Sequence, residues 1–183
     1  MIVLASSSPR RKELLKQISD DFIVEVSNID ESIDRPQKVE DIPYELAYRK
    51  AKAVSKTHYN DIVIGCDTIV AFDNEVLEKP LDEDDAYRML SKLNNNTHKV
   101  ISGVAIIYQD KEIRFIEESL VTFNNLSNED INFYISTKDP LDKAGAYGIQ
   151  ELPDGFIKNI EGDLENIIGI SSKSFEELLK EFQ

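Results

Sequence analysis

The 183-residue sequence lacks several features that define common protein classes. It has one cysteine, Cys66, which excludes an internal disulfide framework and a cysteine-rich zinc site and fits a reducing compartment. No apolar run approaches the roughly 20 residues of a membrane-spanning helix. The first charged residues follow the short apolar stretch 2–5 instead of preceding it, unlike a secretory signal. We therefore expect a cytoplasmic protein.

Basic residues are scarce relative to acidic ones. The chain has 21 Lys and Arg against 35 Asp and Glu, for a formal net charge of −14. Such a chain should repel a polyphosphate backbone, which argues against binding of long nucleic acid. A small phosphorylated ligand remains compatible with this charge if a few basic residues form a local pocket.

Familiar catalytic and nucleotide-binding patterns are also missing. The sequence contains neither a GxxxxGK[ST] phosphate loop nor a GxGxxG fingerprint. The spacing suggests no Ser-His-Asp or Cys-His arrangement. His58 and His98 stand alone, so we expect structural roles for both, and we interpret Cys66 as a small buried residue.

Strands and helices alternate in the first half of the chain, which predicts an α/β protein. We expect strands at 2–6, 22–26 and 61–72, a long hairpin at 98–124, and helices at 9–19, 44–56, 82–95, 127–137 and 173–182. A polar loop is expected to run up to Pro43. No repeat or convincing linker interrupts the pattern, so a single domain over residues 1–183 is the simplest prediction.

The stretch LASSSPRRKELL (4–15) raises an electrostatic question. If Pro9 begins a helix, its first turn contains Arg10, Arg11 and Lys12, where the macrodipole disfavours cations by about 0.3–1 kcal/mol each. A bound phosphate would reverse that effect, because backbone N–H groups and the hydroxyls of Ser6 and Ser8 also favour an anion there. Alternatively, both arginines extend into solvent at little cost.

Asp67 interrupts the apolar strand at 61–72. A lone carboxylate in an apolar interior needs a cation, a metal or hydrogen-bond donors. It could serve as a metal ligand or general base at the end of a central strand, where open α/β sheets bind ligands. A purely structural pairing is the alternative.

Three further positions are candidates for ligand binding. Lys50 lies on an expected helix and Lys79 precedes a proline in LEKP; each is either a solvated surface residue or part of a phosphate pocket with the arginines. Gln150 follows a segment with Gly145 and Gly148, which would allow close approach of a flat ligand. Its amide offers the donor and acceptor that pair with the O4 and N3–H edge of uracil or thymine.

Four stretches, LASSSPRR, GCDT, LEKP and DPLDKAGAYGIQ, occur in this order and together resemble the Maf family. Its members are nucleoside triphosphate pyrophosphatases, first known as septum-formation inhibitors. The similarity runs from about residue 2 to residue 169. The resemblance implies a mixed α/β fold, with a twisted sheet flanked by helices and a deep cleft, akin to the inosine triphosphate pyrophosphatases.

The resemblance also implies roles for individual residues. Asp67 matches the proton acceptor, and Glu31 in NIDES, with Asp67, matches the carboxylates near a divalent cation, Mg²⁺ or Mn²⁺. Positions that match substrate or phosphate contacts are Ser8, Arg11, Lys50 and Lys79. Positions that match the specificity residues of the dTTP and UTP subgroup are Arg10, Thr68 and Gln150. The chain departs from the family at Glu151, at Ser102 and in IIGISS near the end.

We therefore expect an enzyme that hydrolyses dTTP and UTP to the monophosphate and pyrophosphate, with modified pyrimidine nucleotides as further candidate substrates. A homodimer is usual in the family and is a candidate assembly here, but the sequence does not settle the oligomeric state. One alternative is a nucleotide-sensing or division-regulating binding protein without turnover. Another is a phosphatase that removes the terminal phosphate. The released product distinguishes the three.

Overall fold

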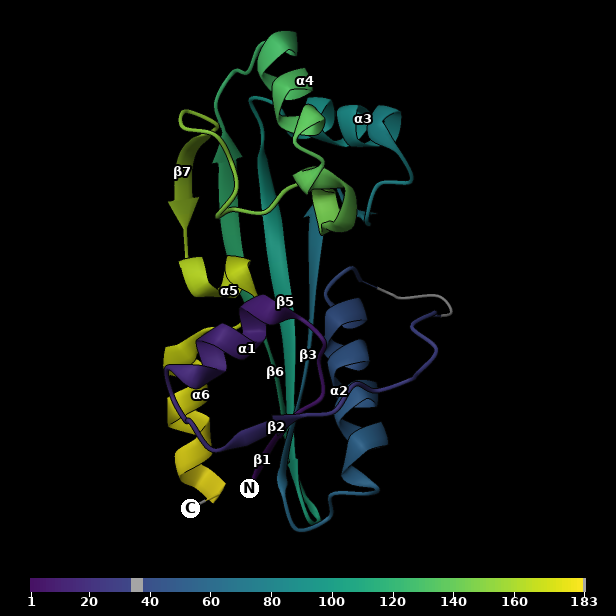
Figure 1. Ribbon diagram of the computed structural model, residues 1–183, viewed down its shortest axis with the longest axis vertical. Coiled ribbons are helices and arrows are strands. Elements are labelled where there is room, and N and C mark those ends of the chain that lie inside the picture. The colour runs from purple at the N-terminus through teal and green to yellow at the C-terminus, as the bar shows by residue number, and fades with distance from the viewer. Residues whose placement is uncertain (34–37, 183) are drawn as a thin grey trace. The chain divides into compact units, whose positions relative to one another are not determined.

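The computed structural model describes residues 1–33 and 38–182, in which strands and helices alternate as expected (Figure 1). In chain order the elements are β1 (Ile2–Leu4), α1 (Pro9–Lys16), β2 (Phe22–Val24), α2 (Asp41–Ser55), β3 (Ile62–Phe72), β4 (Glu75–Leu77), α3 (Glu83–Leu93), β5 (Thr97–Tyr108), β6 (Lys111–Phe123), α4 (Asn128–Ser136), β7 (Ile157–Glu161), α5 (Leu164–Ile168) and α6 (Ser172–Leu179). Short 3-10 turns lie at Asp139–Asp142, Ala144–Ala146 and Lys180–Phe182. No helix in the described part of the chain has the length and apolar character needed to cross a membrane.

The strands form one mixed sheet in the order β2-β1-β3-β5-β6-β7, with β4 paired to β3. Strand β1 runs parallel to both β2 and β3, whereas β3 pairs antiparallel with β4 and β6 with β7. The predicted mixed α/β sheet flanked by helices is thus confirmed. The implied cleft stays a prediction.

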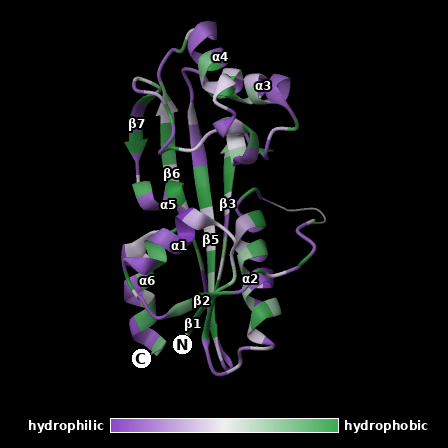
Figure 2. Cartoon of the chain, viewed as in Figure 1, coloured by the Kyte–Doolittle hydropathy of each residue, from purple (hydrophilic) through white to green (hydrophobic). Residues whose placement is uncertain are grey.

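Contacts divide the chain into two compact units. The first contains Met1–Thr68, Ser102–Glu117 and the residues from Gly169 onward. The second contains Ile69–Ile101 and Glu118–Ile168. Strands β3, β5 and β6 each contribute residues to both units, and long stretches of β3 and β5 are hydrophobic (Figure 2).

In the first unit, α2 packs its small apolar face onto the strands. Its buried Ala47, Ala51 and Val54 join a core with residues of β1, β3 and β5. The approach is close at Gly65 of β3, where an added Cβ would lie 2.1 Å from the carbonyl oxygen of Ala47. A side chain at position 65 would therefore push α2 away from the strand.

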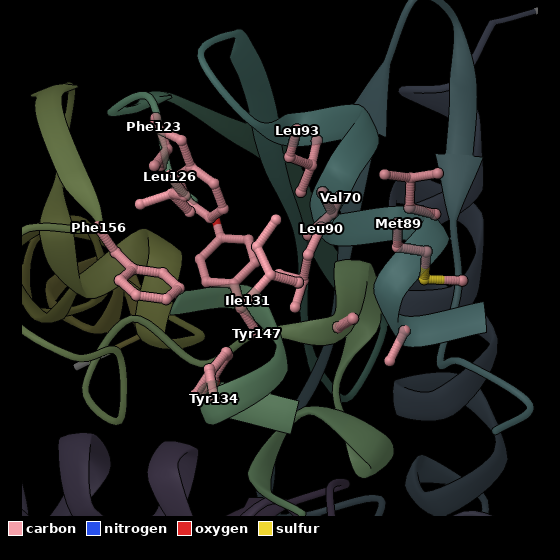
Figure 3. Close-up of a cluster of buried hydrophobic side chains, with 14 of the residues drawn as sticks. Val70, Met89, Leu90, Leu93, Phe123, Leu126, Ile131, Tyr134, Tyr147 and Phe156 are labelled. Carbon is pink, nitrogen blue, oxygen red and sulfur yellow. The ribbon is translucent and has the colours of Figure 1, made fainter. Parts of the chain in front are cut away.

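The second unit has its own core, which contains the buried aromatic residues Phe123, Tyr134, Tyr147 and Phe156 (Figure 3). Helix α3 contributes Met89, Leu90 and Leu93 from one face, and Tyr147 packs edge-on against Phe123 with ring centroids 5.1 Å apart. Helix α4 begins at a capping box in which Ser127 and Asp130 satisfy each other's backbone N–H groups. These local signals support the predicted helix at 127–137, which the structure places at 128–136.

The structure also corrects several expected boundaries. The first helix ends at Lys16 and not near residue 19, and the second strand ends at Val24. The helix at 44–56 begins earlier, at Asp41; residues 34–37 of the expected polar loop lie outside the described residues. The expected hairpin is confirmed, with a loop of two residues between Tyr108 and Lys111.

Three short elements, β4, β7 and α5, were not expected. Strand β4 is three residues long, too short for a hydrophobic period, but a local turn signal precedes it. Asp73 and Asn74 both have positive φ (51° and 60°), the backbone of a type I′ hairpin turn in which Asn and Asp are favoured. The Asp73-Asn74 pair therefore predicts the hairpin that β3 forms with β4.

Candidate active site

Asp67 is buried in the middle of β3, as the sequence predicted; the residue is 9% exposed. Its Oδ1 accepts a hydrogen bond from Lys50 Nζ at 2.7 Å. Among the described residues, Lys50 is the one side chain that hydrogen-bonds this carboxylate, so Oδ2 remains available to a ligand or water. Burial raises the pKa of the Asp67 carboxyl, and the charges of Lys50 and Arg11 offset part of that rise.

Lys50 lies on α2 and joins two carboxylates. Its Nζ lies 2.7 Å from Asp67 Oδ1 and 3.1 Å from Glu31 Oε1. The side chains of Lys50 and Asp67 are 12% and 13% exposed, whereas that of Glu31 is 60% exposed. The ammonium can reach the strand because α2 lies directly on β3 at Gly65, two residues before Asp67.

The contacts of Arg11 explain how a cation is accommodated in the first turn of α1. Its guanidinium turns away from the helix and donates hydrogen bonds to Ser6 Oγ (3.0 Å), the Cys66 carbonyl (3.1 Å), Thr68 Oγ1 (2.9 Å) and the Gly169 carbonyl (3.4 Å). All four acceptors are neutral, so these contacts fix the guanidinium without neutralising it. A positioned cation whose hydrogen bonds all go to neutral oxygens favours an anionic ligand.

Ser8 is the N-cap of α1 and Pro9 its first residue, as expected. The Ser8 hydroxyl accepts a long hydrogen bond, 3.5 Å, from the backbone N–H of Arg11. Arg10 is half-buried on the same turn. The first turn thus combines a hydroxyl, backbone N–H groups and two arginines.

The Thr68 hydroxyl connects Arg11 to the neighbouring strand. Oγ1 accepts from Arg11 Nη2 and also lies 2.8 Å from Ser102 Oγ on β5. Ser102 is fully buried. Ser102 is one of the departures from the family pattern, and no local sequence pattern links it to Arg11, because residues 68 and 102 meet only through strand pairing.

Lys79 and Gln150 belong to the second unit. Lys79 is exposed and precedes the buried Pro80 after β4, and Gln150 is exposed after the turn at 144–146. Their roles toward Asp67 stay predictions. The small residues before Gln150 have a packing role, since an added Cβ on Gly145 would lie 2.8 Å from Val70 Cγ1.

The histidines and the cysteine have structural environments. His98 is buried, its Nε2 lies 2.7 Å from the Tyr147 hydroxyl, and burial lowers its pKa to about 4. His58 lies between Asp61 and Glu25, and its hydrogen bonds to them raise its pKa. Burial raises the pKa of the Cys66 thiol to about 12, so this thiol is not a nucleophile.

The donor set at Asp67 suits a hard divalent cation. Carboxylate oxygens of Asp67 and Glu31 lie 2.7 Å and 3.1 Å from the same atom, Lys50 Nζ. In the described residues 1–33 and 38–182 no three His, Cys, Asp or Glu side chains group as a metal cage. Mg²⁺ is commonly held by one or two carboxylates together with substrate phosphates, so the residues present fit such an ion.

Comparison with known proteins gives a consistent answer. Residues 1–182 match the family described as Maf-like protein. The chain is 44% identical over 181 residues to a dTTP/UTP pyrophosphatase of Bacillus cereus and to one of Bacillus mycoides, covering 99% of this chain and 95% of each relative. A dTTP/UTP pyrophosphatase of Bacillus cytotoxicus is 44% identical over 180 residues. The chain therefore belongs to the Maf-like protein family.

Proposed function

We propose that this protein hydrolyses dTTP and UTP to the nucleoside monophosphate and pyrophosphate. The observation that carries the proposal is the pairing of buried Asp67 with Lys50, beside an Arg11 guanidinium bound to neutral oxygens. The 44% identity to proteins named dTTP/UTP pyrophosphatase supports the substrate class. A protein that only binds nucleotides has no need of a buried carboxylate with a free oxygen.

In this mechanism Asp67 orients and deprotonates the attacking water. Asp67 Oδ2, the oxygen that Lys50 does not engage in the nucleotide-free protein, accepts the proton as the water oxygen bonds to the α-phosphorus and the bond to the pyrophosphate oxygen breaks. The raised pKa of Asp67 moves this base toward neutral pH, where general bases work best. Such a base contributes typically about 10²–10⁴-fold.

The phosphate contacts that we propose are Ser8, Arg11, Lys50 and Lys79. Arg11 and Lys50 supply positive charge close to Asp67, and that charge stabilises the additional negative charge of the transition state. Ser8 and the start of α1 supply hydroxyl and N–H donors. Lys79 adds a second ammonium group.

Asp67 and Glu31 would hold the divalent cation, Mg²⁺ or Mn²⁺, with phosphate oxygens of the substrate completing its coordination. When bound, the ion shields phosphate charge. Arg10, Thr68 and Gln150 are the residues that we propose for base selection. The Gln150 amide pairs with the O4 and N3–H edge shared by uracil and thymine.

A product assay over a panel of nucleotides with Mg²⁺ tests the proposal. Pyrophosphate release, fastest with dTTP and UTP, supports it, whereas orthophosphate release identifies a phosphatase and absence of product a binding protein. The Asp67→Asn variant should lose activity by about 10²–10⁴-fold while its far-UV circular dichroism stays native. Near-normal turnover by a folded Asp67→Asn variant would remove Asp67 from the role of base.

A further inference from the structure

Lys50 occupies the point between the two carboxylates of the candidate metal site. Its single ammonium lies 2.7 Å from Asp67 Oδ1 and 3.1 Å from Glu31 Oε1, and its side chain is only 12% exposed. The close approach at Gly65 fixes the backbone of α2 against β3, and the two ion pairs hold the Lys50 side chain. The ammonium is thus held where both carboxylates already bind a cation.

Building on the function proposed above, we infer that Lys50 is a placeholder cation: it keeps divalent metal out of the nucleotide-free site, so that metal and nucleotide enter together. A divalent ion held by both carboxylates would require the space that the ammonium fills. It would also meet the repulsion of a neighbouring positive charge in a partly buried site. Metal alone therefore competes poorly with Lys50.

The triphosphate removes this competition. Its anionic oxygens offer the ammonium new hydrogen-bond acceptors, so Lys50 can leave one or both carboxylates for phosphate. The released carboxylate oxygens and the phosphate oxygens then form a ligand set of the kind that Mg²⁺ prefers. Lys50 thus changes from occupying the metal site to binding the substrate.

Titration of Mn²⁺ against the nucleotide-free protein, followed by the electron paramagnetic resonance signal of free Mn²⁺ at pH 8, tests the inference. Lys50→Met should bind Mn²⁺ about tenfold more tightly than wild type, or better, because the competing charge is gone. Lys50→Arg, which keeps the charge, and Lys52→Met, the same substitution at an exposed position of the same helix, should bind as weakly as wild type. Adding Glu31→Gln to Lys50→Met should abolish the gain. Equal affinities of Lys50→Met and wild type would overturn the inference.

A second measurement needs no variant and covers the case in which Lys50→Met does not fold. In wild-type protein, Mn²⁺ alone should leave the backbone amide NMR signals of Cys66 and Thr68 sharp, and Mn²⁺ with α,β-methylene-dTTP should broaden them. Broadening by Mn²⁺ alone overturns the placeholder role of Lys50, even if dTTP hydrolysis is confirmed. If neither condition broadens the signals, Asp67 does not hold the metal, and the metal assignment itself fails.

Discussion

The hydrogen bonds of the Thr68 hydroxyl allow a quantitative prediction. Thr68→Val keeps the shape of the side chain but removes the acceptor for Arg11 Nη2 (2.9 Å) and a hydrogen-bond partner of the buried Ser102 hydroxyl (2.8 Å). A hydrogen bond to a charged donor is worth about 1.5–3 kcal/mol, and a neutral one about 0.5–1.5 kcal/mol. Because Arg11 is half-exposed and can recover water, we expect the free energy of unfolding to fall by about 2 kcal/mol.

Urea denaturation followed by circular dichroism measures this change. Thr97→Val is the matched control, since Thr97 forms the same kind of hydroxyl pair, 2.8 Å from Thr122 across two strands, but in an exposed position. There water replaces the lost partner, and the free energy of unfolding should change by no more than about 0.5 kcal/mol.

A double-mutant cycle with Ser102→Ala then isolates the shared contact. The double variant should lose less stability than the sum of the single variants, with a coupling of about 0.5–3 kcal/mol. Additive effects, or a Thr68→Val change as small as that of Thr97→Val, would refute the assignment of these hydroxyls to one network that fixes Arg11.

Three other predictions concern the base, the packing of α2 and pH. Gln150→Ala should lower kcat/KM for dTTP and UTP more than for other triphosphates, and an equal loss for all nucleotides would mean that Gln150 does not read the base. Gly65→Ala should destabilise the protein by about 3 kcal/mol or more in denaturant titrations, because the added Cβ meets the Ala47 carbonyl; an unchanged midpoint would contradict the close packing. His58 has a raised pKa in the folded protein, so its contribution to stability is complete below its unfolded pKa near 6.5 and disappears as pH rises through the folded value. The difference in unfolding free energy between wild type and His58→Gln should therefore shrink from pH 6 to pH 9, and a constant difference would contradict the ion pairs with Asp61 and Glu25.

The local pattern of apolar and turn-forming residues was sufficient to predict the longer helices and strands. The apolar run at 61–72, the long hairpin and the acid-capped helix at 82–95 follow from periodicity and turn chemistry, and the structure confirms each with shifted ends. The short elements β4, β7 and α5 escaped because so few side chains define no period, whereas the equally short β1 and β2 lie within apolar runs that could be recognised. The Asp73-Asn74 turn before β4 is a local signal that does predict the short hairpin of β3 and β4.

For the site, the sequence by itself determined the residue types: one carboxylate in an apolar strand, a few basic residues against an acidic background, and the motifs of the family. Only the tertiary structure decided how they pair. Lys50 reaches Asp67 because α2 lies on Gly65, and the Arg11 guanidinium is held by oxygens from three separate stretches of chain. Sequence patterns record periodicity along the chain, whereas these contacts join residues separated by up to 158 positions, which only the folded backbone brings within hydrogen-bond distance.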